Sequence, residues 1–349
     1  MFEFSGSKLF NEYQPLAVID LNAIKSNAGL IKSRVKRKFC AVVKADAYGH
    51  GLVECARALS SLCDYFAVAS LNEGVALRIA GIKKPILCLL PVKNILRAIE
   101  YDIEFTVHSF DYYREVIKAC NDFGAMASVH IAINSGMNRL GIDSLNELEI
   151  ILNEKRVKAC GVFSHLYNPS SITDRLKQYD IFMPFYKLAK SRNSQIIGHL
   201  ASSAFLGIEG KFQLDMVRVG LAIYGYSAIN SPFRLNPAMK VIAPTLLSRV
   251  IKIGDSLLYG NYKAKENQTV SICAYGYQNG MRKGIKEGLN NACMNLCAVS
   301  GVADYSVIMS DAFEYANRTN SIPYEVLTAF GNNCKRIYQL ESNYENNFR

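Results

Sequence analysis

The sequence predicts an α/β fold, namely an eight-stranded (β/α)8 TIM barrel followed by a mainly β C-terminal domain. Between about residues 38 and 223, short apolar runs alternate with helical patterns, whereas after about residue 231 strand-like runs follow one another without long helices. With 349 residues, half of them hydrophobic, the chain is long enough for two cores. We expect a barrel domain over residues 12–231 and a mainly β domain over 232–349, with residues 1–11 able to pack against the latter.

Eight apolar runs provide the predicted barrel strands, and each is short and continuous, as is typical of parallel strands buried on both faces. They cover residues 39–43, 65–68, 85–90, 104–107, 129–133, 159–163, 196–200 and 216–221. Because no GxGxxG motif follows the first run, a dinucleotide-binding sheet is disfavoured. Eight strand–helix units favour a barrel over an open sheet.

Helical patterns separate most of these runs, most clearly at residues 70–80, 109–123 and 144–152. Ser109 and Ser144 stand where helix N-caps are expected, and Gly81 ends the first of the three helices. In the second domain, the strand-like runs are 245–251, 255–259, 269–274 and 297–302.

Charge, hydropathy and cysteine content indicate which partners the protein lacks. The formal charge is +10, but the densest basic run, at 34–38, has no interleaved aromatic residues and is typical of a solvated helix end rather than of a nucleic-acid site. No apolar run is long enough to cross a membrane, and the N-terminus lacks a signal-peptide pattern. Ten scattered cysteines fit a reducing cytoplasm and form no metal-binding motif. We therefore expect a cytoplasmic protein with no metal, membrane or nucleic-acid partner.

Lys44 directly follows the first apolar run, in the segment Ala41-Val-Val-Lys44-Ala-Asp-Ala-Tyr48-Gly-His-Gly51. Burial lowers the pKa of a lysine and makes its amine a nucleophile that can form a Schiff base. The alternative is a lysine whose stem extends to the barrel rim. The neighbouring glycines and Tyr48 favour the reactive lysine, because glycine permits close backbone approach and a tyrosine hydroxyl can bond a phosphate.

This segment resembles the Val-Val-Lys-Ala-(Asn/Asp)-Ala-Tyr-Gly-His-Gly signature of the bacterial alanine racemase family, whose members bind pyridoxal 5'-phosphate (PLP). The resemblance extends from about residue 14 to 340. It implies a PLP-binding barrel, a β domain and a homodimer, with Lys44 carrying the cofactor. The residues that it assigns to cofactor binding are Lys44, Tyr48, His165, Ser203, Arg218, Gly220 and Leu221.

Further motifs carry the substrate residues. Asn134-Ser-Gly-Met-Asn-Arg139-Leu-Gly is similar to the family motif whose arginine binds the substrate carboxylate. The resemblance makes Tyr259 the second catalytic base, contributed to the partner subunit's site, and makes Tyr277 and Ala303 substrate contacts. Four positions depart from the family. Ala132 replaces a lysine that is commonly carbamylated and steadies Arg139, and Asn332 aligns loosely with a phosphate-binding tyrosine. Asn279 replaces an aspartate and Lys283 an arginine.

The resemblance implies an isomerase that interconverts L- and D-alanine by a two-base mechanism and supplies D-alanine for cell-wall peptidoglycan. Lys44 would serve the D-enantiomer and Tyr259 the L-enantiomer, with a lowered tyrosine pKa or a relay through His165 and Arg218. Three alternatives stay open: a racemase for serine or another amino acid, a PLP-binding protein without turnover, and a barrel-type PLP decarboxylase.

Overall fold

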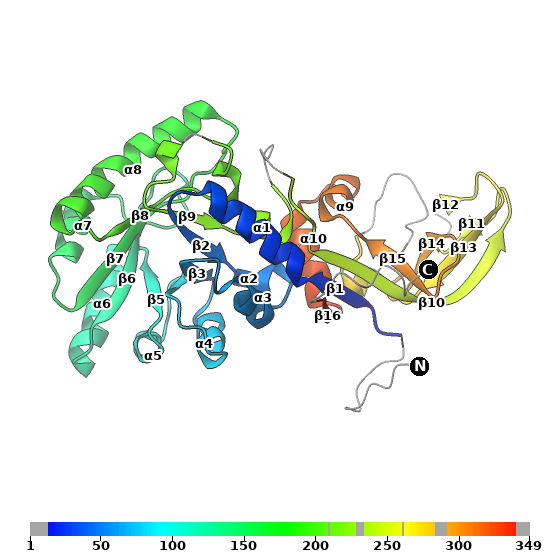
Figure 1. Cartoon of the computed structure of the whole chain (residues 1–349), viewed down its shortest axis with the longest axis horizontal. Helices are drawn as coiled ribbons and strands as arrows, with labels where there is room; N and C mark the ends of the chain where they lie inside the picture. The colour runs from blue at the N-terminus through cyan, green and yellow to red at the C-terminus, as the bar shows by residue number, and fades with distance from the viewer. Residues whose placement is uncertain (1–12, 209, 228–233, 260–261, 283–291, 340–349) are drawn as a thin grey trace. The chain divides into compact units, whose positions relative to one another are not determined.

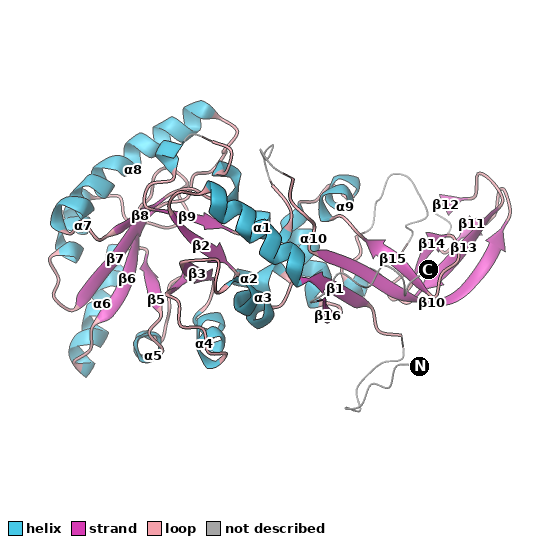
Figure 2. Ribbon diagram, viewed as in Figure 1, coloured by secondary structure: helices cyan, strands magenta, loops and turns pink. Residues whose placement is uncertain are grey.

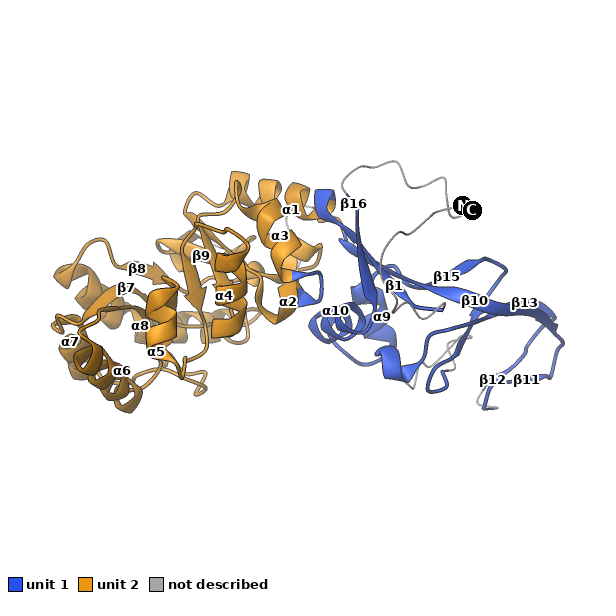
Figure 3. Ribbon diagram, turned by 90° about the horizontal axis from the view of Figure 1, so that it is seen from below, with its two compact units in different colours: residues 1–22, 48–51, 237–349 blue, residues 23–47, 52–236 orange. Residues whose placement is uncertain are grey.

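The computed structural model describes residues 13–208, 210–227, 234–259, 262–282 and 292–339. The described chain divides into two compact units, which are coloured separately in Figure 3. One unit contains residues 23–47 and 52–236, and the other contains the residues up to Asn22, the segment 48–51 and the residues from Pro237 onward. The domain bounds at residues 12 and 231 stay a prediction, and residues 1–11 lie outside the described residues.

The first unit is a nearly closed parallel barrel, which confirms the predicted fold class. Its strands run in the order β8-β7-β6-β5-β4-β3-β2-β9, and the hydrogen bond from Arg218 N to Ala201 O (3.0 Å) helps to join the two ends of this sheet. The strands are β2 (Lys38–Val42), β3 (Tyr65–Val68), β4 (Ile86–Cys88), β5 (Glu104–Val107), β6 (Ala127–Ala132), β7 (Val157–Phe163), β8 (Ile197–His199) and β9 (Met216–Val219). Each predicted run overlaps one of these strands, so the sequence located all eight.

Helices follow the strands along the chain (Figures 1 and 2). They are α1 (Leu21–Arg34), α3 (Leu52–Leu59), α4 (Leu71–Ile79), α5 (Ile95–Glu100), α6 (Phe110–Phe123), α7 (Leu145–Leu152) and α8 (Ile172–Arg192). The Ser109 side chain caps α6 by accepting a hydrogen bond from Tyr112 N (3.2 Å), as predicted. Ser144 stands at the N-cap position of α7, as predicted, but its side chain makes no capping hydrogen bond.

The second unit is built on a six-stranded sheet, in the order β14-β13-β10-β1-β16 with β15 also paired to β10. Its strands are β1 (Leu16–Asp20), β10 (Met239–Ile251), β13 (Gln268–Cys273), β14 (Cys297–Ser300), β15 (Tyr305–Met309) and β16 (Lys335–Gln339), with a small hairpin of β11 (Ser256–Leu257) and β12 (Tyr262–Lys263). The helices α9 (Ala312–Arg318) and α10 (Pro323–Asn332) complete it. Strand β1 pairs antiparallel to β10 and parallel to β16, a placement that the sequence analysis did not predict.

A short left-handed turn, α2 (Lys44–Tyr48), follows the first barrel strand. Four consecutive residues with side chains, at positions 45–48, have φ values of 53–55°. Because Cβ crowds the following carbonyl oxygen there, each such residue costs about 1–2 kcal/mol. Hydrogen bonds hold the turn: Asp46 N donates to Glu73 Oε1 (3.1 Å), and Leu52 N donates to Asp46 Oδ1 (2.7 Å). The turn therefore fixes the backbone immediately after Lys44.

Candidate active site

The barrel gathers four of the predicted site residues at the carboxyl ends of its strands, where barrel enzymes form their sites. Lys44 lies two residues beyond β2, His165 lies two residues beyond β7, and Arg218 lies within β9. Arg139 comes from the loop after β6. The positive charges of these residues act on one another, which shows that the fold brings them together.

Burial and charge both shift the pKa values of this group. Burial, with the nearby charges of Arg139 and Arg218, lowers the pKa of Lys44, while Glu73 partly opposes the shift. Burial and the same two arginines, with Lys44, lower the pKa of His165 to about 3. At neutral pH His165 is therefore an uncharged imidazole, and the amine of Lys44 is easier to deprotonate than that of an ordinary lysine.

Arg218 is buried and fixed by three hydrogen bonds. Its Nη1 donates to His199 Nδ1 (2.6 Å) and to His199 O (2.8 Å), and its Nη2 donates to Ser164 O (2.8 Å). The guanidinium also lies 5.3 Å from the centre of the Phe163 ring. Burial lowers its pKa to about 10, so it remains protonated at neutral pH. Arg218 is thus a rigid, permanent charge inside the barrel.

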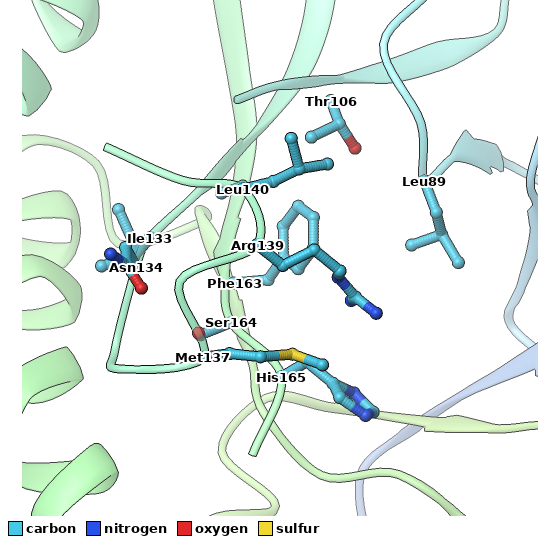
Figure 4. Close-up of a pocket in the computed structure, with 11 residues that line it drawn as sticks. Leu89, Thr106, Ile133, Asn134, Met137, Arg139, Leu140, Phe163, Ser164 and His165 are labelled. Carbon is cyan, nitrogen blue, oxygen red and sulfur yellow. The ribbon is translucent and has the colours of Figure 1, made fainter. Parts of the chain in front are cut away.

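A cavity of about 40 Å³ lies beside Arg139 (Figure 4). In this view the side chains of Arg139 and His165 extend toward the same side. The residues that line it are Leu89, Thr106, Ala132, Ile133, Asn134, Met137, Arg139, Leu140, Phe163, Ser164 and His165. Ala132 supplies only a methyl group to this wall, and no ion pair of Arg139 occurs within the described parts of the chain. The arginine is therefore available to an external anion.

Ser203 holds the turn that follows β9. Its Oγ accepts hydrogen bonds from Gly220 N (3.0 Å) and Ala222 N (3.3 Å). Leu221 begins the 3-10 helix η3 (Leu221–Tyr224), and the first N–H of a helix has no partner within it. The Ser203 hydroxyl proton and the Leu221 N–H are thus the donors that this turn can offer to an anion, whereas Gly220 N already has an acceptor.

The other predicted residues belong to the strand-rich unit. The ring of Tyr48 packs against that of Tyr324, at 5.8 Å between centres, and burial raises the pKa of Tyr48. Tyr259 follows β11, is 69% exposed, and lies beside Cys293 and Tyr277, whose thiol and hydroxyl raise its pKa. The lowered tyrosine pKa considered from the sequence does not occur within a single chain. Ala303 and Asn332 are exposed.

Two barrel residues near this site were missed by the sequence analysis. His130 on β6 and Glu104 at the start of β5 connect to Arg218 through His199. The available signal was a histidine and a glutamate inside apolar strand runs, because polar groups in such runs require buried partners.

The described residues contain no group of three or more histidine, cysteine, aspartate or glutamate side chains that could hold a metal ion. Among those residues, none of the helices is long and apolar enough to cross a membrane.

Together, the fold and the cationic cluster define a TIM barrel with a group of positively charged side chains at the carboxyl ends of its strands, an arrangement that attracts anions. The family model described as alanine racemase, N-terminal domain, matches residues 19–228. The alanine racemase of Cutibacterium acnes is 36% identical over 286 residues, which cover 77% of this chain and 76% of that protein. The chain belongs to the alanine racemase family and is a racemase enzyme.

Other relatives extend the match along the whole chain. The alanine racemase of Streptococcus uberis is 29% identical, covering 93% of this chain and 97% of its own. Two solved structures each have a TM-score of 0.83 and 26% identity, and each covers 95% of this chain. They are the alanine racemase from the D-cycloserine producer Streptomyces lavendulae, covered over 98% of its length, and that from Bacillus anthracis with bound L-Ala-P, covered over 96%.

Proposed function

We propose that this enzyme interconverts L- and D-alanine with PLP bound at Lys44 and with two bases, Lys44 and Tyr259. The observation that supports this most strongly is the cationic cluster of Lys44, Arg139 and Arg218. The only acidic side chain acting on Lys44 among the described residues is Glu73. Such a cluster requires anions, and PLP with an amino acid supplies a phosphate and a carboxylate.

The residues fit PLP by the chemistry of their donors. A lysine with a lowered pKa suits attachment to an aldehyde, and the hydroxyl of Ser203 with the Leu221 N–H suits a phosphate. The Bartonella henselae alanine racemase, whose structure contains covalently bound pyridoxal phosphate, shares the fold at a TM-score of 0.81 and 24% identity. When bound, PLP withdraws electrons from the α-carbon of the substrate, so that its proton can be removed.

In this proposal the two bases work on opposite faces of the substrate. The Lys44 amine removes the α-proton of D-alanine, and the Tyr259 hydroxyl returns a proton to the opposite face; L-alanine reacts in the reverse sense. Arg139 would bind the substrate carboxylate, because its guanidinium lines the cavity and can pair with an anion there. Tyr277 and Ala303 would complete the substrate contacts. Tyr48 would assist at the phosphate, and Gly220 N would hold the Ser203 hydroxyl that binds it.

In this proposal Arg218 would face the pyridine nitrogen of PLP and would set the electronic character of the reaction. With a pKa of about 10 it stays charged and cannot transfer its proton to the pyridine nitrogen as a carboxylic acid can. Arg218 would in this way limit how strongly the bound cofactor withdraws electrons, and so would disfavour protonation at the wrong carbon. His165, neutral because its pKa is about 3, can accept a hydrogen bond from the second base.

Two features of Tyr259 support a homodimer in which it completes the partner's site. The side chain is 69% exposed, and its pKa within one chain is raised. A cluster of cations like that around Lys44 lowers the pKa of a tyrosine brought close to it. Insertion into the partner's barrel would therefore supply the environment that a basic tyrosine requires. We further propose a cytoplasmic role in supplying D-alanine for peptidoglycan.

A second candidate is racemisation of serine or another amino acid. It is favoured by the cavity beside Arg139, where Ala132 replaces the family's larger lysine. A PLP-binding protein without turnover is a third candidate, but it would leave Tyr259 without a role.

Racemisation assays separate these candidates. The purified protein with added PLP should convert L-alanine into D-alanine until the two are equal, and should act more slowly on other amino acids. Faster turnover of serine would favour the second candidate, and bound PLP without turnover of any amino acid would favour the third.

A further inference from the structure

Four side chains form a continuous hydrogen-bonded chain through the interior of the barrel. Arg218 Nη1 lies 2.6 Å from His199 Nδ1, and His199 Nε2 lies 2.8 Å from His130 Nδ1. His130 Nε2 lies 2.8 Å from Glu104 Oε2, which closes the chain. The four residues come from β9, β8, β6 and β5, and we call them the Glu-His-His-Arg chain.

The chain crosses the barrel from one end toward the other. Glu104 is the first residue of β5, whereas His199 is the last residue of β8. Barrel interiors are ordinarily filled by branched apolar side chains. Here His130 and His199 are fully buried, and their rings pack at 5.0 Å between centres.

A glycine on the neighbouring strand leaves space for the Glu-His-His-Arg chain. Strand β7 lies between β6 and β8, and Gly161 on β7 faces the His130 ring. A Cβ atom at position 161 would overlap His130 Nδ1, the atom that faces His199. The absence of a side chain at Gly161 is therefore a condition for the central hydrogen bond of the chain.

The donors in this chain can point in only one direction. A guanidinium is a donor only, so His199 Nδ1 must accept from Arg218 and its proton must be on Nε2. His199 Nε2–H then donates to His130 Nδ1, which leaves the His130 proton on Nε2. His130 donates that proton to Glu104. An ionised carboxylate can only accept hydrogen bonds, so it ends the series of donors.

The charge states of the members agree with this direction. Burial and the charge of Arg218 lower the pKa of His199 well below its ordinary value, so its ring is neutral. Burial raises the pKa of Glu104, but the hydrogen bonds from His130 and Tyr65 and the charge of Lys158 outweigh it and keep the carboxylate ionised. The other neighbours are Cys160, beside Glu104, and Cys40, beside Arg218; burial raises the pKa of both thiols.

We infer that Glu104 is a positioning residue for the reaction: as the terminal acceptor of the Glu-His-His-Arg chain, it fixes both histidine tautomers and thereby holds Arg218 in its orientation. This inference rests on the proposed function, in which Arg218 faces the cofactor ring. Without an acceptor at 104, the His130 proton can move to Nδ1 and point at His199. The His199 proton would then lie on Nδ1, donor against donor with Arg218.

Three substitutions separate the effect of the Glu104 acceptor oxygen from the effects of its charge and of its second hydrogen bond. Glu104→Leu removes the acceptor. Glu104→Gln keeps an acceptor oxygen for His130 but removes the charge. Tyr65→Phe is the matched control, because it deletes the hydrogen bond to the other carboxylate oxygen, Oε1 (3.3 Å), and leaves Oε2 and His130 untouched.

The main measurement is the protonation of the ring nitrogens by NMR of protein labelled with 15N-histidine. The protein has five histidines. The signals of His130 and His199 can be assigned by their loss in His130→Asn and His199→Asn proteins. Wild-type protein, Tyr65→Phe and Glu104→Gln should all carry the His199 proton on Nε2. Glu104→Leu should carry it wholly or partly on Nδ1.

Two further readouts connect the chain to the site. In Glu104→Leu protein the visible absorption of bound PLP should shift, and kcat/KM should fall about tenfold to a hundredfold through kcat rather than KM. Glu104→Gln should recover at least about a third of the wild-type kcat. A Glu104→Gln protein that behaves like Glu104→Leu would show that charge matters instead of direction, and would overturn the inference.

The tautomer measurement also protects the test against misfolding. If Glu104→Leu does not fold, the wild-type spectrum still decides, because a His199 proton on Nδ1 contradicts the chain. Unchanged tautomers in folded Glu104→Leu protein contradict it as well. A protein with the expected tautomers but without racemase activity would count against the proposed function alone, since no substrate is needed for the spectrum.

Discussion

The barrel unit and the strand-rich unit hold their predicted site residues in different ways. In the barrel, Arg218 is buried, makes three hydrogen bonds and lies over an aromatic ring. In the strand-rich unit, Tyr259 is 69% exposed and Ala303 lies on the surface. The barrel residues are positioned by their own unit, whereas Tyr259 would complete a site only against another surface, as the proposed homodimer requires.

The difference teaches which part of the proposed chemistry a single chain can prepare. A rigid cationic cluster suits the binding of a cofactor and a carboxylate, because fixed charges need no rearrangement when the ligands bind. An exposed tyrosine suits a contribution to a neighbouring chain. Substitutions in the two units should therefore have separable effects on cofactor binding and on turnover.

The largest effect is expected at Lys44. The Lys44→Ala enzyme should lose the visible absorption of attached PLP and more than about ten-thousandfold in kcat, because both the attachment point and one base are gone. In wild-type protein, borohydride should fix the cofactor to the peptide that contains Lys44. Labelling of a different lysine would remove this residue from the centre of the comparison.

Replacement of Tyr259 should affect turnover alone. Tyr259→Phe should bind PLP with an unchanged spectrum but lose about a hundredfold to ten-thousandfold in kcat, the range for loss of one general acid or base. Tyr13→Phe, which alters another exposed tyrosine of the same unit, is the control and should keep full activity. Full activity in Tyr259→Phe would end the two-base assignment.

Mixed dimers test whether Tyr259 acts across the subunit interface. Refolding equal amounts of Lys44→Ala and Tyr259→Phe chains should make about half of the dimers mixed, each with one intact site, so about a quarter of wild-type activity should return. If both bases belong to one chain's site, every site carries a defect and no activity returns. Mass spectrometry of the dimers must show that mixed pairs are present.

A smaller effect on stability is expected at the position that makes room for His130. Gly161→Ala should lower the free energy of unfolding by about 1–3 kcal/mol, because the new Cβ overlaps the His130 ring. Gly29→Ala in α1 is the control: apart from its two neighbours and the backbone of its own helix, no heavy atom lies within 4 Å of the added Cβ, and alanine should stabilise the helix by about 0.5–1 kcal/mol. Urea unfolding of both proteins measures the contrast, and equal effects would contradict it.

The smallest effect concerns pH. The folded pKa of His165, about 3, is below its unfolded value of about 6.5, so the unfolded chain takes up the proton first. The stability of the enzyme should therefore fall as pH drops from 6.5 toward 3. His165 can account for at most about 1.4 kcal/mol per pH unit, less because the side chain is partly exposed. His165→Gln should flatten this slope in urea unfolding between pH 6 and 5, and an unchanged slope would assign it to other groups.

The fold could be predicted closely because buried parallel strands leave continuous apolar runs in the sequence. Tyr65–Val68 and Glu104–Val107 were predicted with the same bounds that the structure gives them. The run at 216–221 was predicted too long, since the strand ends at Val219 and a 3-10 helix begins at Leu221. Local turns of this kind depend on contacts such as those of Ser203, which lie outside a hydrophobic pattern.

The candidate site was predictable where a motif carried it and unpredictable where tertiary contacts carry it. Lys44, Arg139, His165 and Arg218 follow from short motifs, and the fold brings them together. The connection of Glu104 to Arg218 joins residues more than a hundred positions apart, which no spacing rule predicts. The pairing of β1 with β16 is equally non-local.

The left-handed turn after Lys44 has a consequence for how this segment tolerates change. At most positions in a chain of L-residues a D-residue strains the backbone, but at positions 45–48 the backbone has the geometry that D-residues prefer. Synthetic protein with D-alanine in place of Ala45 should relax the turn without altering its path. A glycine at Ala45 would relax it too, but would free the segment to sample other paths. A backbone segment with the left-handed geometry of D-residues therefore begins one residue after Lys44, whose amine is proposed to act in the interconversion of both enantiomers of the substrate.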